Sequence, residues 1–390
     1  METSLGIDWQ LNDRSGWGIY GINLVLQLQA GGKIRPMLLN LPANLPENPL
    51  HRDLITPAIE RFRILDDALG NSGAGGVEVN MTVLHALGNR FIFKQSPLRG
   101  KCRVGVVFFE DTLIDDAARS RAAGFDILLA GSTWNEQVLI HNGFKDVRKI
   151  IQGIDPAIFH PAPGTGLFKN RYVIFSGGKL EYRKGQDIVV AAFKRFHAKH
   201  PEALLLVAWH NGWPETMAEI GVGGYVSGPP VTDRYNRPDI AAWLVENGVL
   251  PEDFSVIPET PNVYMGAVVR EADVGLFPNR AEGGTNLVAM ECMASGVPVI
   301  LSANTGHLDF CKMPLCFPLK EQKPVRPTPV MRGTEGWGET SVSEIVENLE
   351  KIYTDRDAAA KRAARAAEIL QGYTWENQVT KLVSAFKDVI

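Results

Sequence analysis

The sequence predicts an α/β protein of two domains, each built around a parallel sheet. The chain has 390 residues, and at about 150 residues per domain this is enough for two or three separate cores. Short apolar runs alternate with segments of helical composition in both halves, which is typical of strand–helix–strand units. Glycine-rich loops follow several of the apolar runs, where sheets of this kind bind their ligands.

The N-terminal segment predicts a strand, a glycine loop and a helix at about 20–29. Gly16, Gly18 and Gly21 form a G-x-G-x-x-G pattern ahead of that helix. The pattern occurs where phosphates approach a helix N-terminus, so Gly16 and Gly18 are candidate contacts for a phosphate. A glycine-rich turn without a ligand is the alternative, because the pattern alone is a weak signal.

The rest of the first half continues the alternation of strands and helices. Strands are expected at 35–41, 77–79, 91–93 and 104–109, and a strand, a helix and a strand within 125–155. Glu110 and Asp111 end one of these strands, and ligands of open α/β sheets lie at the carboxyl ends of strands. The acidic pair is therefore a candidate part of a site, although Asp111 could instead cap the following helix.

A proline- and glycine-rich stretch at 160–170 predicts the linker between the domains. After it, a strand expected at 171–178 leads into a basic loop with Lys179, Arg183 and Lys184, followed by a helix at about 187–200. Cations beside a helix N-terminus suit a phosphate and would stabilise charge that grows on it in a transition state. An exposed turn is the alternative for this loop.

The stretch RAEGGTNLVAMECMASGVPV, residues 280–299, predicts a loop and a helix after a buried strand at 272–279. Asn286 is a suitable N-cap for the helix, and Gly296 and Pro298 are stop signals at its end. Free N–H groups at such a helix start favour an anion. The candidate contacts are the acid, the loop and the first turn: Glu282, Gly283, Gly284, Thr285, Asn286 and Leu287.

Glu291 lies in the middle of this expected helix, among apolar residues, where a carboxylate is costly without a partner. It could accept hydrogen bonds from the two neighbouring hydroxyls of a ribose. Alternatively, it faces solvent or a structural lysine. Glu282, at the end of the strand, could meet sugar hydroxyls nearer to a reacting carbon.

Composition argues against several classes of function. The net charge of −4 gives no basic excess of the kind that nucleic-acid binding needs, so no nucleic-acid partner is expected. The apolar runs are too short to span a bilayer, and no secretory signal is visible. The cysteines and histidines lack metal-ligand spacing, so we expect no metal site and reduced thiols in a cytoplasmic protein.

Taken in order, the motifs resemble the GT-B glycosyltransferases of family 4 over most of the chain. The resemblance is carried by SGWGIYGINL, GFKDVRKIIQGIDPAIFHP, SGGKLEYRKGQDIVVAAF, ADVGLFPNRAEGGTNLVAMECMASGVPVI and YTWENQVTKLVSAF. It implies two Rossmann-like domains facing a central cleft. Residues 1–162 would form the acceptor domain and 163–371 the nucleotide-sugar donor domain, and a last helix within 372–390 would cross back onto the first domain.

The resemblance implies a retaining transferase that moves a hexose from a UDP- or GDP-sugar to a hydroxyl of a glycan, a lipid-linked acceptor or a protein. It implies no metal, and no cofactor besides the nucleotide sugar as co-substrate. A non-catalytic nucleotide-sugar binding protein on the same scaffold is the alternative. We expect a cytoplasmic protein, either free or in peripheral contact with the inner face of the membrane.

By position, Lys184 resembles the diphosphate lysine of the family, Glu291 its ribose-binding glutamate, and Gly18 the loop glycine beside the donor phosphates. Lys179 stands where the family usually has an arginine, which keeps the charge but loses the bidentate fork. The residues expected to act in catalysis are Lys184, Lys179, Glu282 and Glu110.

The spacing of the two glutamates departs from the family pattern, which puts seven residues between them. Here eight residues separate Glu282 from Glu291, so Gly283 stands in the first position. A one-residue bulge at Gly283 and Gly284 would restore Glu282. The acceptor-side histidine of many family members is also not at its expected position, where Glu110 and Asp111 stand at the corresponding strand end, and this leaves the acceptor and its base open.

Overall fold

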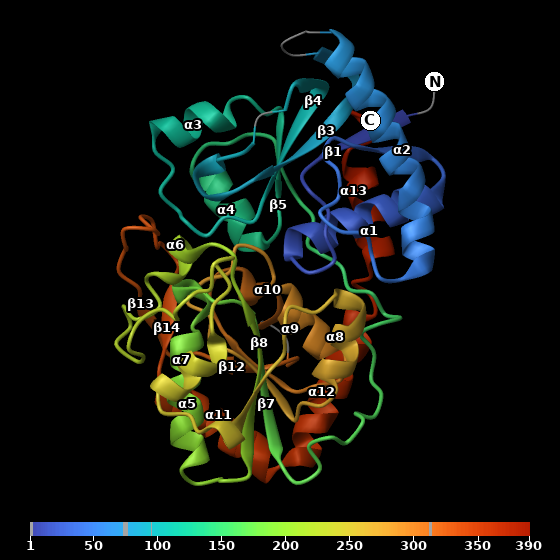
Figure 1. The fold of residues 1–390 in the computed structure, drawn as a ribbon. Coiled ribbons are helices and arrows are strands. Elements are labelled where there is room, and N and C mark those ends of the chain that lie inside the picture. The colour runs from blue at the N-terminus through green and yellow to red at the C-terminus, as the bar shows by residue number, and fades with distance from the viewer. Residues whose placement is uncertain (1–2, 73–76, 95, 312–313) are drawn as a thin grey trace. The chain divides into compact units, whose positions relative to one another are not determined.

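The computed structural model describes residues 3–72, 77–94, 96–311 and 314–390. They form two α/β units, coloured along the chain in Figure 1. Unit 1 comprises the residues up to Gly153 together with Pro261–Val263 and Tyr373–Ile390, and unit 2 comprises Ile154–Thr260 and Tyr264–Gly372. The chain therefore enters unit 2 somewhat ahead of the division expected between 162 and 163.

Unit 1 is built on a parallel six-stranded sheet in the order β2-β1-β3-β4-β5-β6. Its strands are β1 (Thr3–Asp8), β2 (Ile34–Leu38), β3 (Val77–Leu87), β4 (Leu98–Val107), β5 (Ile127–Ala130) and β6 (Val147–Lys149). Its helices are α1 (Gly16–Gly31), α2 (Pro49–Ser72), α3 (Asp116–Ala122), α4 (Thr133–His141) and α13 (Trp375–Ala385), with the 3₁₀ turn η1 (Asn89–Phe91).

Two local expectations in unit 1 are wrong. Residues 91–93 do not form a strand, because the chain turns through η1 with Arg90 and Phe91 at φ of 56° and 55°. The glycine pattern is not a loop ahead of a helix. Helix α1 already begins at Gly16, and the hydroxyl of Ser15 caps it by accepting from the N–H of Gly18 at 3.2 Å.

Helix α13 belongs to unit 1, where it packs on α1. The rings of Trp375 and Tyr20 lie 5.7 Å apart between centroids. Beyond the helix, Asp388 accepts two hydrogen bonds of 2.8 Å from Arg148, next to the end of the sheet at β6. Gly153 leaves room for this segment, since a Cβ there would lie 2.5 Å from the backbone nitrogen of Trp375. The C-terminal segment is thus held in unit 1 by packing and by charge.

Unit 2 is built on a second parallel six-stranded sheet, in the order β12-β11-β10-β7-β8-β9. Its strands are β7 (Tyr172–Lys179), β8 (Ala203–His210), β9 (Phe254–Val256), β10 (Val274–Phe277), β11 (Val299–Ser302) and β12 (Phe317–Leu319). The order reverses between β7 and β10, as in a doubly wound nucleotide-binding sheet, and such reversals mark the ligand site.

Helices cover both faces of the sheet of unit 2 (Figure 1). They are α5 (Gln186–His197), α6 (Pro214–Met217), α7 (Ile240–Glu246), α8 (Asn262–Val269), α9 (Leu287–Ala294), α10 (Leu308–Cys311), α11 (Val342–Thr354) and α12 (Arg356–Leu370), with 3₁₀ turns η2 (Tyr182–Lys184), η3 (Pro251–Asp253) and η4 (Thr305–His307). Residues 320–340 add a small antiparallel pair of strands, β13 (Gln322–Pro324) and β14 (Gly338–Thr340).

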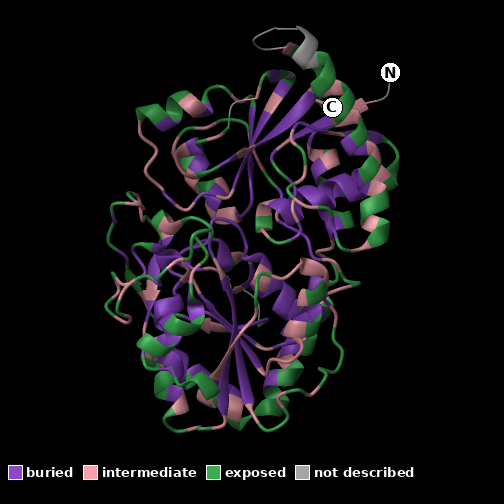
Figure 2. Ribbon diagram, viewed as in Figure 1, coloured by how far each residue is buried: buried purple, intermediate pink, exposed green. Residues whose placement is uncertain are grey.

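The strands of each sheet form the centre of each core, shown as buried in Figure 2. Strand β8 is buried from Ala203 to Trp209, as expected for a parallel strand covered on both faces. Helix α5 packs against this sheet with Ile188, Val189 and Phe193. This packing fixes the loops at the carboxyl ends of β7 and β10 to a rigid base.

Candidate functional site

Three loops meet at the carboxyl edge of the unit 2 sheet, where the strand order reverses. Strand β7 ends at Lys179 and leads through η2 into α5, and β10 leads through residues 278–286 into α9. Because β7 pairs with β10 and β10 with β11, the loops after these three strands are neighbours. The third loop carries η4.

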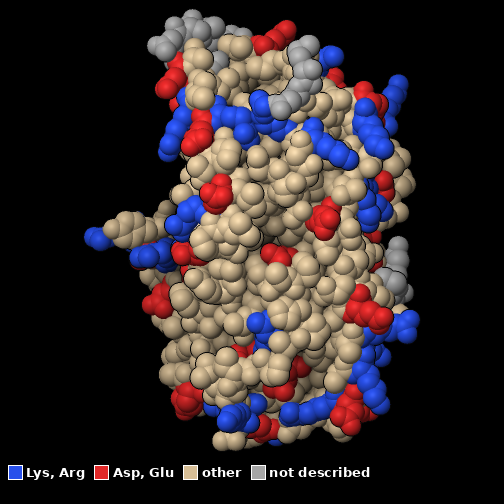
Figure 3. Space-filling model, turned by 90° about the vertical axis from the view of Figure 1, so that its right-hand side faces the viewer, with Lys and Arg blue, Asp and Glu red and all other residues tan. Residues whose placement is uncertain are grey.

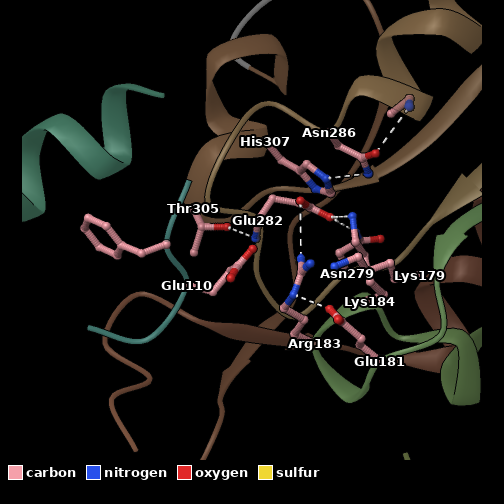
Figure 4. Close-up of polar contacts among 12 residues, drawn as sticks. Glu110, Lys179, Glu181, Arg183, Lys184, Asn279, Glu282, Asn286, Thr305 and His307 are labelled. Atoms are coloured by element: carbon pink, nitrogen blue, oxygen red, sulfur yellow. Dashed lines mark hydrogen bonds and ion pairs between the residues drawn. The ribbon is translucent and has the colours of Figure 1, made fainter. Parts of the chain in front are cut away.

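The basic loop after β7 and the loop at residues 278–286 after β10 are joined by an ion pair between Lys184 and Glu282 (Figure 4). Asn279 donates its side-chain N–H to the same carboxylate oxygen at 2.5 Å. Arg183 lies 3.5 Å from the other oxygen of Glu282 and 2.7 Å from Glu181. Two cations and two carboxylates are therefore held together with little exposure to water.

Glu282 is ionised at neutral pH. Burial alone would raise its pKa, but the charges of Lys184 and Arg183 outweigh burial and lower the pKa to about 2. Burial would also raise the pKa of Glu181, and Arg183 and Lys179 lower it instead. The positive charge of the loop is thus balanced by fixed carboxylates, and an anionic ligand placed here competes with Glu282 for Lys184 and Arg183.

Glu282 is anchored by its backbone as well as by its carboxylate. Its N–H donates to the hydroxyl of Thr305 at 2.8 Å, and its carbonyl accepts from the N–H of Gly306 at 3.0 Å. A Cβ on Gly306 would lie 1.7 Å from the carbonyl oxygen of Gly284, so the η4 turn fits the glycine loop only with glycine at that position. This fit turns the side chain of Glu282 toward Lys184 despite the eight-residue spacing to Glu291.

The N-terminus of α9 is capped by Asn286, as predicted. The Asn286 backbone is left-handed, with φ of 61°, and its side-chain oxygen accepts from the N–H of Ala289 at 3.4 Å. Its amide nitrogen donates to Nε2 of His307 at 3.1 Å, and Nδ1 of His307 donates to the carbonyl of Ser302 at 3.1 Å. This arrangement requires a neutral His307, and burial lowers its pKa to about 4.

The remaining residues predicted in unit 2 take different places. Thr285 donates its hydroxyl to the sulfur of Met290 at 3.0 Å, and Leu287 is the first residue of α9. Glu291 is buried in the middle of α9, which removes the alternative that it faces solvent. Lys179 lies over the ring of Trp213, with Nζ 4.2 Å from the centroid.

We expect the stability of the protein to fall between pH 6.5 and pH 4 because of His307. In that range the unfolded state binds a proton that the folded state does not, so the loss grows as the pH falls, to about 2 kcal/mol at pH 5. His307→Gln keeps a donor and an acceptor but does not titrate. Urea unfolding at pH 7 and pH 5 should show a smaller pH effect for the variant than for the wild type, and an equal pH effect would contradict the assignment.

The candidate residues of unit 1 lie in α1 and after β4. Glu110 is half-buried, and its N–H donates to the side-chain oxygen of Asn89 at 2.7 Å. Asp111 is buried and accepts from the N–H of Leu113 at 3.0 Å. It does not cap the following helix, because Asp115 does so for α3.

Gly18 has a packing role that needs no ligand. A Cβ at this position would lie 2.3 Å from the carbonyl oxygen of Asn12, whereas a Cβ on Gly16 would meet nothing within 4 Å. Gly18→Ala should therefore destabilise unit 1 by about 2 kcal/mol through overpacking. Gly16→Ala, in the same helical turn, is the matched control and should be neutral or slightly stabilising. Thermal unfolding of both variants tests this, and equal melting temperatures would refute the packing role.

Several residues that complete the site, or their contacts there, were not predicted from the sequence. Arg183 was predicted as one of the cations of the basic loop but not as a partner of Glu282, and Asn279, Thr305 and His307 were not predicted. Their signal is position, because Asn279 follows β10, and Thr305 and His307 follow β11, at the edge where the other site residues lie.

Comparison with known proteins agrees with this geometry. The family described as Family 4 Glycosyltransferase in conflict systems matches residues 139–382, more than half of the chain. The chain belongs to this family. The predicted resemblance to family 4 glycosyltransferases is thereby confirmed.

One relative of this family 4 glycosyltransferase is a D-inositol 3-phosphate glycosyltransferase of Acidothermus cellulolyticus. It is 28% identical over 190 residues, which cover 46% of the chain and 39% of the relative. The chain thus matches well under half of the length of that relative.

Solved structures share the fold over nearly the whole chain. Sucrose-phosphate synthase from Thermosynechococcus elongatus has a TM-score of 0.63 at 15% identity, with 99% of this chain and 98% of that chain covered. Anabaena Alr3699/HepE in complex with UDP-glucose has a TM-score of 0.62 at 12% identity, with 98% and 99% covered. The two parallel sheets match the predicted GT-B fold class, which is confirmed.

The described part of the chain offers neither a membrane span nor a metal cluster. None of their helices combines the length and the apolar character that crossing a bilayer requires. They include no cluster of three or more His, Cys, Asp or Glu side chains suited to a metal ion. On the face shown in Figure 3, basic side chains are interspersed with acidic ones.

Proposed function

We propose that this family 4 glycosyltransferase transfers a hexose, with retention, from a nucleotide-diphosphate sugar to a hydroxyl acceptor. The observation that carries the proposal is the cluster of Lys184, Arg183 and Glu282 beside the capped start of α9, at the strand reversal of unit 2. Fixed cations and the N-terminus of a helix together suit a diphosphate. The UDP-glucose complex of the structural neighbour is consistent with a donor of this class.

The bound diphosphate replaces Glu282 as the anion that pairs with Lys184 and Arg183. Lys184 and Arg183 stabilise the charge that develops on the leaving nucleoside diphosphate as the bond to the sugar breaks, so no divalent ion is needed for that task. Displaced from Lys184, the carboxylate of Glu282 is available to a sugar hydroxyl. Glu291 accepts hydrogen bonds from the ribose hydroxyls of the donor.

The acceptor side is proposed to lie on unit 1. The acceptor is a glycan, a lipid-linked molecule or a protein, and Glu110 is the candidate that receives its hydroxyl proton. Lys179 adds positive charge near the diphosphate.

The proposal is tested by following the release of nucleoside diphosphate from UDP- and GDP-hexoses, with sugar and lipid acceptors and with and without EDTA. We expect turnover that EDTA does not reduce, and NMR of the product should show the anomeric configuration of the donor. Tight nucleotide binding without turnover for any donor would instead indicate a non-catalytic binding protein. An inverted product would contradict retention.

A further inference from the structure

Arg280 is a completely buried arginine between the two loops that form the site. Its exposed fraction is 0%, and it follows Asn279 in the loop after β10. Its guanidinium donates to both carboxylate oxygens of Asp187, at 2.8 and 2.7 Å. The Asp187 side chain is also 0% exposed, so this is a fully desolvated bidentate pair.

The guanidinium is also fixed on its other sides. It donates to the carbonyl of Tyr182 at 2.7 Å and to Glu339 of β14 at 2.8 Å. The guanidinium carbon, Cζ, lies 3.9 Å from the centroid of the Tyr182 ring, and this adds a cation–π contact. Only the planar fork of arginine can make all of these contacts from one position.

Arg280 contacts residues on both sides of Lys184 in the sequence. Tyr182 precedes Lys184 in η2, and Asp187 follows it in the first turn of α5. The backbone N–H of Arg280 donates to the carbonyl of Arg183 at 2.7 Å, and the N–H of Ala281 donates to the same carbonyl at 3.2 Å. One residue therefore holds the loop of Lys184 by side chain and by backbone.

Glu282 lies two residues beyond Arg280, so the same residue also sets the position of the carboxylate. We propose that Arg280 is a positioning residue that fixes Lys184 and Glu282 at the spacing needed for a donor diphosphate. The inference rests on the proposed function. Asp187 is its structural partner in this role, and Arg280 itself need not touch the donor.

The test removes Arg280 together with its fully buried partner Asp187, so that the carboxylate left without the arginine is that of Glu339, whose side chain is 23% exposed. Arg280→Met together with Asp187→Leu replaces both ions by apolar side chains of similar volume, an exchange that often preserves folding. We expect a near-native melting temperature, a kcat lower by about 10²-fold, as for misplaced catalytic groups, and a KM changed by less than the change in kcat. Arg280→Lys, which keeps the charge but not the fork, should lose most of the same activity.

A double-mutant cycle with Lys184→Gln separates positioning from general stability. If Arg280 acts through Lys184, the Arg280→Met/Asp187→Leu exchange should have little further effect on kcat when Lys184 is already replaced. Equal losses in both backgrounds, or an unchanged kcat in the wild-type background, would overturn the proposal.

A third readout needs no turnover. In protein labelled with ¹³C at lysine, the Lys184 side-chain signal should shift in the Arg280→Met/Asp187→Leu protein and stay in place in Lys199→Gln. If this shift occurs but the wild-type protein turns over no nucleotide sugar, the positioning role holds and the proposed function fails. If the wild-type protein turns over a nucleotide sugar but the Lys184 signal does not shift in the Arg280→Met/Asp187→Leu protein, only the positioning role fails.

Discussion

Replacing Lys184 by glutamine is expected to lower kcat/KM for the nucleotide sugar by about 10²- to 10³-fold, the range seen when one fixed donor to developing charge is lost. Lys184 is one of two cations on Glu282, and its side chain is only 12% exposed, so its charge acts in a dry site. Glutamine still offers an N–H to Glu282, which limits the structural damage. Steady-state kinetics with the best donor provides the measurement.

Lys199→Gln is the matched control for this variant. Lys199 forms a lysine–glutamate pair in the same unit, at 3.3 Å from Glu350, but it is 64% exposed. Exposed pairs contribute little, so the control should keep full activity and stability. Activity of Lys184→Gln within a few-fold of this control would contradict the role assigned to Lys184.

Replacing Glu282 by glutamine is expected to move binding and turnover in opposite directions. The variant loses the anion that competes for Lys184 and Arg183, and a unit charge about 5 Å away is worth about 3 kcal/mol at an effective dielectric of 20. Partial screening reduces this, so nucleoside diphosphate should bind about tenfold more tightly. Calorimetric titration of the wild type and Glu282→Gln gives the comparison.

Turnover of Glu282→Gln should fall by about tenfold or more. Tighter binding of the diphosphate in the ground state and in the product complex does not lower the barrier and slows release. KM and kcat should therefore both decrease. Glu350→Gln is the control, since Glu350 is a glutamate of the same unit that pairs with the exposed Lys199 and with His200 and is not part of the three loops of the site. Weaker nucleotide binding by Glu282→Gln would show that its carboxylate does not compete with the diphosphate.

The order of elements in unit 2 could be predicted because strong local signals mark it. The helix at 287–294 has a capping asparagine, Asn286, before it and Gly296 after it, and both signals hold in the structure. The positions of Lys184 and Glu282 at strand ends follow from the same reasoning, because parallel strands bring their carboxyl ends to one edge.

The partners within the site could not be predicted, because they depend on contacts between loops far apart in sequence. Nothing in the local sequence shows that Arg280 is buried against Asp187, ninety-three residues away, or that Thr305 anchors Glu282. The glycine pattern of unit 1 shows that a local motif can also suggest a ligand contact where packing alone explains the residue. Gly18 fits a phosphate loop by spacing, but its lack of a side chain is required by Asn12.

The most direct test of the diphosphate site is a comparison of nucleoside monophosphate and diphosphate binding by the wild type and by Lys184→Gln, measured by calorimetry for uridine and guanosine nucleotides. For the preferred base, the wild type should bind the diphosphate much more tightly than the monophosphate, and Lys184→Gln should lose most of that difference, because a charged hydrogen bond of about 1.5–3 kcal/mol is removed. An undiminished preference for the diphosphate in Lys184→Gln would place the diphosphate elsewhere and contradict the site described for unit 2.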